Sequence, residues 1–142
     1  MSATCDCGRP QPFSKCCEPI LNGEVEASDP ETLMRSRYSA FVHKNIDYLY
    51  ESLDPQARGD WDQKGTEEWA NNAEFLGLEI VKATNEGNKG SVEFKARFKM
   101  EAAPGEGVKE HVHHELSKFR KQGGIWYFRD GKVFEPPAEQ RK

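Results

Sequence analysis

All four cysteines of this 142-residue chain lie within thirteen positions near its start: Cys5, Cys7, Cys16 and Cys17. Four thiolates in a C-x-C-x8-C-C array can close a tetrahedron around one Zn²⁺ ion, with two ligands from each end of a short loop. Gly8 follows the first pair and lets the backbone turn, so that amide groups can point towards sulfur. Because four cysteine ligands leave no open coordination position, we expect a structural zinc ion rather than a catalytic one.

Disulfides, redox chemistry and an unmetallated segment are the alternatives to zinc. Pairing within either cysteine pair would be strained, so disulfides would have to cross between the two ends of the loop. An iron–sulfur cluster also takes four cysteines, but usually with wider spacing. The first residues show no basic segment followed by an apolar core, so we expect no signal peptide and a cytoplasmic location. In that compartment clustered cysteines favour thiolate ligation over disulfides.

Composition excludes two classes of partner. The chain is 36% hydrophobic and 11% aromatic, which is typical of a folded domain with its own core. Its net charge of -4 is too small to steer the protein towards a polyanion, so we expect no nucleic-acid partner. No run approaches the roughly 20 apolar residues that a membrane span requires, so we expect no membrane association.

The part of the chain after the cysteines first shows helical periodicity. Ser28 is a candidate N-cap, with Pro30 in the first turn and Glu31 three residues on, as in a capping box. Asn45 is a candidate helix end, and Asp54-Pro55 stops the next helix. We therefore expect helices at 28–45 and 46–53, a polar loop at 56–65 and a further helical turn at 66–69.

The pattern then changes to the two-residue period of β-strands. We expect strands at 75–84, 91–100, 108–121 and 125–129, joined by turns, and a frayed tail from Glu135. Helices followed by hairpin-linked strands predict an α+β fold with an antiparallel sheet. A curved four-stranded sheet wrapped round N-terminal helices forms a cone with a cavity at its mouth, which is the NTF2-like fold.

The cysteine segment resembles a known element. Residues 5–8, Cys-Asp-Cys-Gly, and 13–17, Phe-Ser-Lys-Cys-Cys, look like the SEC-C motif, the zinc-binding tail element of the preprotein translocase ATPase. Arg9 stands where that motif usually has serine, and Glu18 where it often has glycine. The resemblance implies zinc binding and, by analogy alone, a protein partner of the export or ribosome-associated chaperone type.

Three later segments extend the resemblance to a whole family. Residues 35–41, 114–119 and 124–131 look like the bacterial YchJ family, whose members join an SEC-C clip to an NTF2-like domain. This implies a zinc motif with its connector at 1–27 and an NTF2-like domain at 28–142. Many members carry a second SEC-C element at the C-terminus, whereas residues 18–142 of this chain contain no cysteine.

The third predicted strand, at 108–121, carries the candidate acid–base residues of the domain. Alternate residues from 111 to 119 share one face, and Phe119 on that face is a core residue, which directs His113 and Glu115 towards the cavity. A carboxylate and an imidazole in an apolar cone could act as an acid–base pair, as the NTF2-like ketosteroid isomerases place an acid there. The structural alternative is an ion pair between Glu115 and Arg35 or Arg37.

Two functional hypotheses follow from these features. The first is a non-enzymatic adaptor that docks on a protein partner through the zinc clip, whose tip carries Arg9 and Lys15. The second is a small-molecule binder or enzyme that uses the cavity, for which we name four ligand-binding candidates: Arg35, Arg37, Tyr38 and Trp126. Aromatic residues of this kind are also common in cores.

Two further predictions concern the histidines. His111 and His113 lie on a different strand face from His114, which disfavours a second metal site. We expect His43, near the end of the first helix, to act as a favourable cation there.

Overall fold

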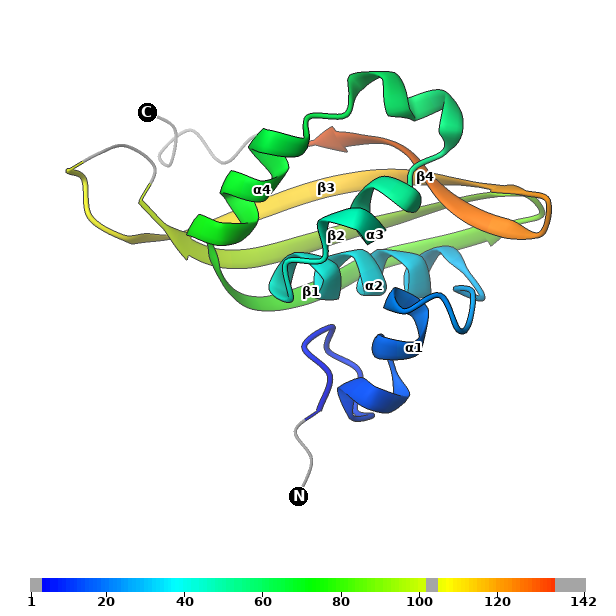
Figure 1. The fold of residues 1–142 in the computed structure, drawn as a ribbon, viewed down its shortest axis with the longest axis horizontal. Helices are drawn as coiled ribbons and strands as arrows, with labels where there is room; N and C mark the ends of the chain where they lie inside the picture. The colour runs from blue at the N-terminus through cyan, green and yellow to red at the C-terminus, as the bar shows by residue number, and fades with distance from the viewer. Residues whose placement is uncertain (1–3, 102–104, 135–142) are drawn as a thin grey trace.

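A four-stranded antiparallel meander is the centre of the fold (Figure 1). The computed structural model describes residues 4–101 and 105–134. Within them the strands are β1 (Glu74–Glu86), β2 (Lys89–Met100), β3 (Lys109–Gln122) and β4 (Ile125–Val133), in the sheet order β1-β2-β3-β4. The predicted α+β class and antiparallel sheet are confirmed. The predicted tail from Glu135 lies outside the described residues.

The helical elements precede the sheet in the chain. They are η1 (Phe13–Lys15), α1 (Glu18–Leu21), α2 (Pro30–Val42), α3 (Ile46–Glu51), η2 (Pro55–Asp60) and α4 (Gln63–Asn72). Figure 1 shows α2, α3 and α4 on one face of the sheet, and the cysteine-bearing segment on the side of α2 away from α3. No helix in the described part of the chain has the length and apolar character needed to cross a membrane.

Helix α2 is enclosed on nearly every side. Its N-cap is Asp29, whose side chain accepts a hydrogen bond from the Thr32 amide at 2.7 Å, so the predicted cap at Ser28 is one residue early. Nine of its thirteen residues are buried, including polar Ser36, Arg37 and Ser39. A helix on a protein surface buries only one stripe, so burial all round shows that α2 is packed between two different parts of the protein.

The region predicted as a polar loop at 56–65 is largely helical, as η2 and the start of α4. Aspartates begin both elements: Asp54 accepts a hydrogen bond from the Gln56 amide, and Asp62 accepts one from the Gly65 amide. The prediction was wrong because this stretch has no apolar periodicity, and its helices depend on these caps instead.

Strand β4 continues beyond its predicted end at Arg129. Lys118 pairs with Asp130 but Phe119 pairs with Phe128, so one extra residue is inserted in β4 at this point. Such a bulge lets the strand bend and continue, and Asp130-Gly131 therefore lies in the strand rather than in a turn.

The core lies between α2 and the inner face of the sheet. Leu33, Met34 and Tyr38 of α2 contact Val92, Phe94 and Ala96 of β2, together with Phe119 and Trp126. A second, separate cluster of buried side chains is formed by Cys5, Cys7 and Cys17. The clip and the domain thus have distinct interiors that meet at α2.

Candidate metal centre and cavity

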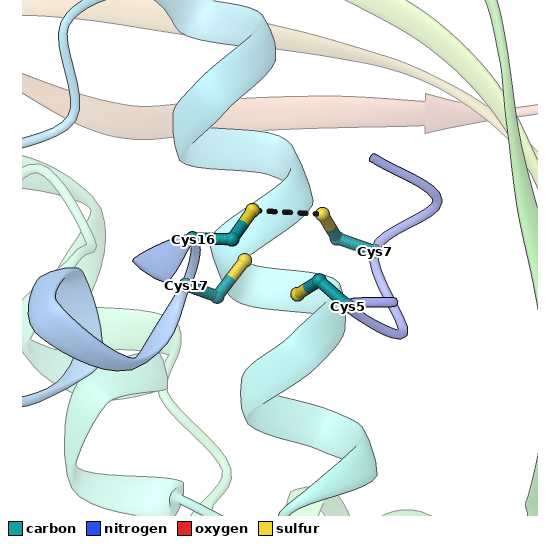
Figure 2. A group of neighbouring side chains, drawn as sticks. All are labelled: Cys5, Cys7, Cys16 and Cys17. Atoms are coloured by element: carbon teal, nitrogen blue, oxygen red, sulfur yellow. Dashed lines mark hydrogen bonds between the residues drawn. The ribbon is translucent and has the colours of Figure 1, made fainter. Parts of the chain in front are cut away.

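The four cysteine sulfurs converge on one point (Figure 2). All four Sγ atoms lie within 4.8 Å of one another, and those of Cys7 and Cys16 are 3.6 Å apart. A tetrahedral site with zinc–sulfur bonds of about 2.3 Å has sulfur–sulfur edges of about 3.8 Å. The cysteines are free, and three of them are buried. The donor set therefore fits a tetrahedrally coordinated metal ion better than a pair of disulfides.

Local backbone structure brings the two cysteine pairs together. The Cys5 amide donates to the Gln11 carbonyl at 2.7 Å, and Thr4 forms a bridge with Pro12, which closes the first arm of the loop. Gly8 has a φ of 98°, a left-handed conformation that other residues rarely adopt, and it makes the turn after Cys7. The predicted role of Gly8 in this turn is confirmed.

The four cysteine thiols differ in their pKa values. A hydrogen bond from Cys17 lowers the pKa of Cys7 to about 5, against the opposing effect of burial. Burial raises the pKa of Cys16 to about 12, and the neighbouring Cys7 raises that of Cys17. Cation binding requires the thiolate form of all four cysteines, so it would have to displace the protons that burial and the neighbouring Cys7 hold on Cys16 and Cys17.

One face of α2 fastens this clip to the domain. The Arg35 guanidinium donates to the Cys7 carbonyl at 2.6 Å, and the Ser39 hydroxyl donates to Asp6 Oδ1 at 2.6 Å. His43 Nε2 lies 2.7 Å from Asp6 Oδ2. Ser39 and His43 were not identified from the sequence as contacts of the clip, although their spacing of four residues was a usable signal. His43 binds Asp6, a role that its position near the helix end did not predict.

The opposite face of α2 forms one wall of a cavity of about 240 Å³. Polar groups gather on its lining: Arg37, His113, Glu115 and Ser117. Aromatic rings make up most of the rest: Tyr38, Phe41, Trp69, Phe75, Phe94 and Phe128. An apolar pocket with a few convergent polar groups is the usual form of a small-molecule site.

Glu115 is held firmly in this cavity. Its Oε1 lies 2.7 Å from His113 Nε2, and its Oε2 accepts a hydrogen bond from Ser117 at 2.6 Å. Burial acts to raise the pKa of Glu115, but these two hydrogen bonds and the charges of His113 and Arg37 together bring it below its ordinary value of 4.5. Glu115 is therefore a fixed carboxylate at neutral pH. Gly131 packs directly against it, leaving no space for a side chain.

Arg37 makes its direct contacts away from Glu115. It donates to the Leu49 carbonyl at 2.9 Å and to the Ser52 hydroxyl, and its guanidinium lies 4.6 Å from the centre of the Phe128 ring. Burial lowers the pKa of Arg37 to about 10, which leaves it charged at neutral pH. The expected ion pair between Glu115 and Arg35 or Arg37 is wrong, because histidine and serine neighbours on its own strand occupy the carboxylate.

The six cavity candidates fall into two groups. Arg37, Tyr38, His113 and Glu115 meet in the cavity as predicted, whereas Arg35 faces the clip. Trp126 is a core residue, 4% exposed, that lines a separate hollow beside the connector. The sequence did not show which arginine faces inward, because both sides of α2 are buried. Trp69 was not among the predicted cavity residues, and α4 brings its ring 5.9 Å from that of His113.

Comparison with known proteins agrees with this arrangement. Residues 29–131 match the family model for the middle NTF2-like domain of YchJ. A UPF0225 protein of Geobacter sulfurreducens is 40% identical over 146 residues, covering 100% of this chain and 87% of its own. The solution structure of a SEC-C motif-containing protein from Rhodopseudomonas palustris has a TM-score of 0.81 and 38% identity, covering 95% of this chain and 100% of that one.

A crystal structure of a SEC-C motif-containing protein from Psychrobacter arcticus has a TM-score of 0.71 and 33% identity, covering 99% of this chain and 81% of that one. The fold and the cysteine cluster thus define an NTF2-like protein with an N-terminal SEC-C clip that can hold a metal ion. Within that class, the chain belongs to the YchJ (UPF0225) family. The resemblance stated from the sequence is confirmed.

Proposed function

We propose that this protein is a non-catalytic binding protein that takes a small organic molecule into the α2–sheet cavity and uses a structural Zn²⁺ ion to secure its N-terminal clip. The observation that carries the proposal is the position of α2, which lies between the cysteine cluster and the cavity. Four thiolates from a short loop form a closed donor set, so the ion would supply folding energy rather than a reactive position.

The zinc proposal is tested by metal analysis of the purified chain together with a thiol count. We expect about one equivalent of zinc, and four thiols that react only after chelation. Less than half an equivalent of zinc, with four reactive thiols under reducing conditions, would contradict it.

The state of Glu115 supports binding over catalysis. An efficient general acid or base has a pKa near the working pH, and the pKa of Glu115 is shifted away from neutrality. An ionised carboxylate beside aromatic walls suits a ligand with an apolar body and one hydrogen-bond donor, such as an amine, directed at Glu115.

A thermal-shift screen of small aromatic and alkyl amines, with matched carboxylic acids as the comparison set, tests the cavity. We expect stabilisation by amines, lost in Glu115→Gln and also in Ala96→Leu, which fills the cavity without removing a polar group. Stabilisation that persists in the filled variant would place the ligand elsewhere. A Glu115→Gln chain that unfolds would assign Glu115 a structural role.

A protein-docking role for the clip is the second candidate. While α2 covers one side of the clip, Gly8, Pro10, Ser14 and Lys15 remain exposed on the loop between the cysteine pairs. Lys15 gives this surface a positive charge, which suits an acidic partner segment. Loss of a co-purifying partner in Lys15→Glu, with zinc content unchanged, would support docking, and an unchanged set of partners would contradict it.

A further inference from the structure

The face of α2 that meets the clip carries a regular stripe of polar residues. Arg35, Ser39 and His43 are spaced by four positions, which places them one above the other on the helix. All three direct their side chains at the same short arm of the clip, residues 5–7. A single helix face therefore contacts the first two cysteine ligands through the residues around them.

Asp6 is the centre of these contacts. It lies between Cys5 and Cys7, and each of its carboxylate oxygens has a partner from α2 or from its C-cap residue. Ser39 binds Oδ1 and His43 binds Oδ2 at 2.6 and 2.7 Å. With both oxygens occupied, rotation of the Asp6 side chain is prevented, and the backbone on which the two thiols are carried is held in place.

The same helix also contacts Cys17 of the second cysteine pair. Arg35 donates to the Cys7 carbonyl, while the Arg35 carbonyl lies 3.8 Å from the Cys17 sulfur. The His43 ring stacks on Phe13 in the intervening loop, with ring centres 4.2 Å apart. Both cysteine pairs thus contact one helix, the first through the Cys7 carbonyl and the second through the Cys17 sulfur.

We propose that Arg35, Ser39 and His43 are positioning residues that set the metal affinity of the clip by preorganising the Cys5–Cys7 arm. A flexible arm loses conformational freedom when it closes on a metal, and an arm already held in place loses less. Partners that hold metal ligands from outside typically contribute 10–100-fold to affinity. This inference rests on the proposed zinc site.

The chain offers a matched pair of substitutions for the test. Ser39→Ala removes a hydroxyl that binds Asp6, whereas Ser36→Ala removes a hydroxyl of the same helix that binds Tyr48 and the Leu33 carbonyl. Both serines are fully buried, so both variants lose stability. Only the first alters a contact with the clip.

Metal affinity is measured on the full chain by competition with a chelator for Zn²⁺, and the ligand geometry by the absorption spectrum of the Co²⁺-loaded protein. Ser39→Ala should bind Zn²⁺ at least about 10-fold more weakly than wild type, with Ser36→Ala unchanged. Equal affinities for the wild type and Ser39→Ala would overturn the inference. A wild type that binds no zinc would instead refute the proposed metal site.

Two further variants keep the test decisive if Ser39→Ala folds poorly. His43→Phe, at a partly exposed position, retains a ring against Phe13 but removes the contact with Asp6, and should also weaken zinc binding about 10-fold. In an Asp6→Ala background, Ser39→Ala should have no additional effect, because the hydroxyl acts through that carboxylate. If the losses of zinc affinity caused by Asp6→Ala and Ser39→Ala were additive, Ser39 would act on stability alone and not through the Asp6 carboxylate.

Discussion

The clip and the cavity occupy opposite faces of one helix and were unequally visible in the sequence. Every candidate metal ligand comes from residues 5–17, so spacing alone identified the set. The cavity is lined by residues of α2, α4 and all four strands, from Met34 to Phe128. A local site is determined by chain geometry over a few residues, whereas a distributed one requires the tertiary fold to bring its residues together.

The largest expected effect separates the two regions. Cys16→Ser removes one of four ligands, so we expect zinc binding to fall by at least about 100-fold, since the binding energy is coupled to ligand number. The main unfolding transition of the domain, followed by circular dichroism, should persist, because its core is distinct from the cysteine cluster. Loss of the whole fold on chelation would show that the two regions are one unit.

Gly131→Ala is the strongest expected perturbation on the cavity side. A Cβ at this position would collide with the Glu115 carboxylate, so the side chain must move from its partners. We expect a loss of about 1–3 kcal/mol in the free energy of unfolding, with zinc affinity unchanged.

Gly59→Ala is the matched control, because a Cβ at Gly59 meets no atom within 4 Å. Denaturant unfolding of both variants gives the comparison. Equal stability of the two variants would mean that Glu115 can move without cost, contrary to the packing described here.

We expect a somewhat smaller effect from the pH-dependent contribution of Glu115 to the free energy of unfolding. The folded-state pKa of Glu115 is lowered, so its ionised form stabilises the fold above the unfolded pKa of about 4.5, and that contribution is lost as the pH falls through the lower folded value. Glu115→Gln should therefore cost about 1–2 kcal/mol at pH 7 and progressively less below pH 4.5. A difference between the two proteins that stays constant from pH 7 to pH 3 would contradict this assignment.

The smallest effect is expected on the outer face of the sheet. Arg97 and Glu110 form an ion pair at 3.0 Å, but both side chains are about half exposed. Such pairs contribute about 0–1 kcal/mol, so Arg97→Ala should leave stability, zinc binding and cavity binding nearly unchanged. A loss comparable with that of Gly131→Ala would mean that this face is buried by a partner in solution.

Particular residues show why prediction succeeded in part. The strand alternation from His111 to Phe119 placed His113 and Glu115 correctly on the inner face, because a two-residue period decides the side of a sheet directly. Periodicity could not show in the same way which of Arg35 and Arg37 faces the cavity. A helix packed on two sides carries no single apolar stripe, so its orientation depends on the clip, which periodicity does not describe.

The sequence also did not show that Arg37 would have other partners than Glu115. An arginine on the helix that packs against the sheet is a reasonable partner on charge alone, but the Leu49 carbonyl and the Ser52 hydroxyl engage Arg37 instead. The contact of Asp6 with Ser39 and His43 depends on how the clip docks on α2. Short-range chemistry was predictable here, and contacts between separate segments were not.

X-ray absorption spectroscopy of the zinc-loaded protein tests the central claim most directly, because it reports the atoms bound to the metal. We expect a shell of four sulfur atoms at about 2.3 Å, unchanged in the cavity variant Ala96→Leu. A shell containing nitrogen or oxygen, or fewer than four sulfurs, would show that Cys5, Cys7, Cys16 and Cys17 do not form the closed structural site on which this account depends.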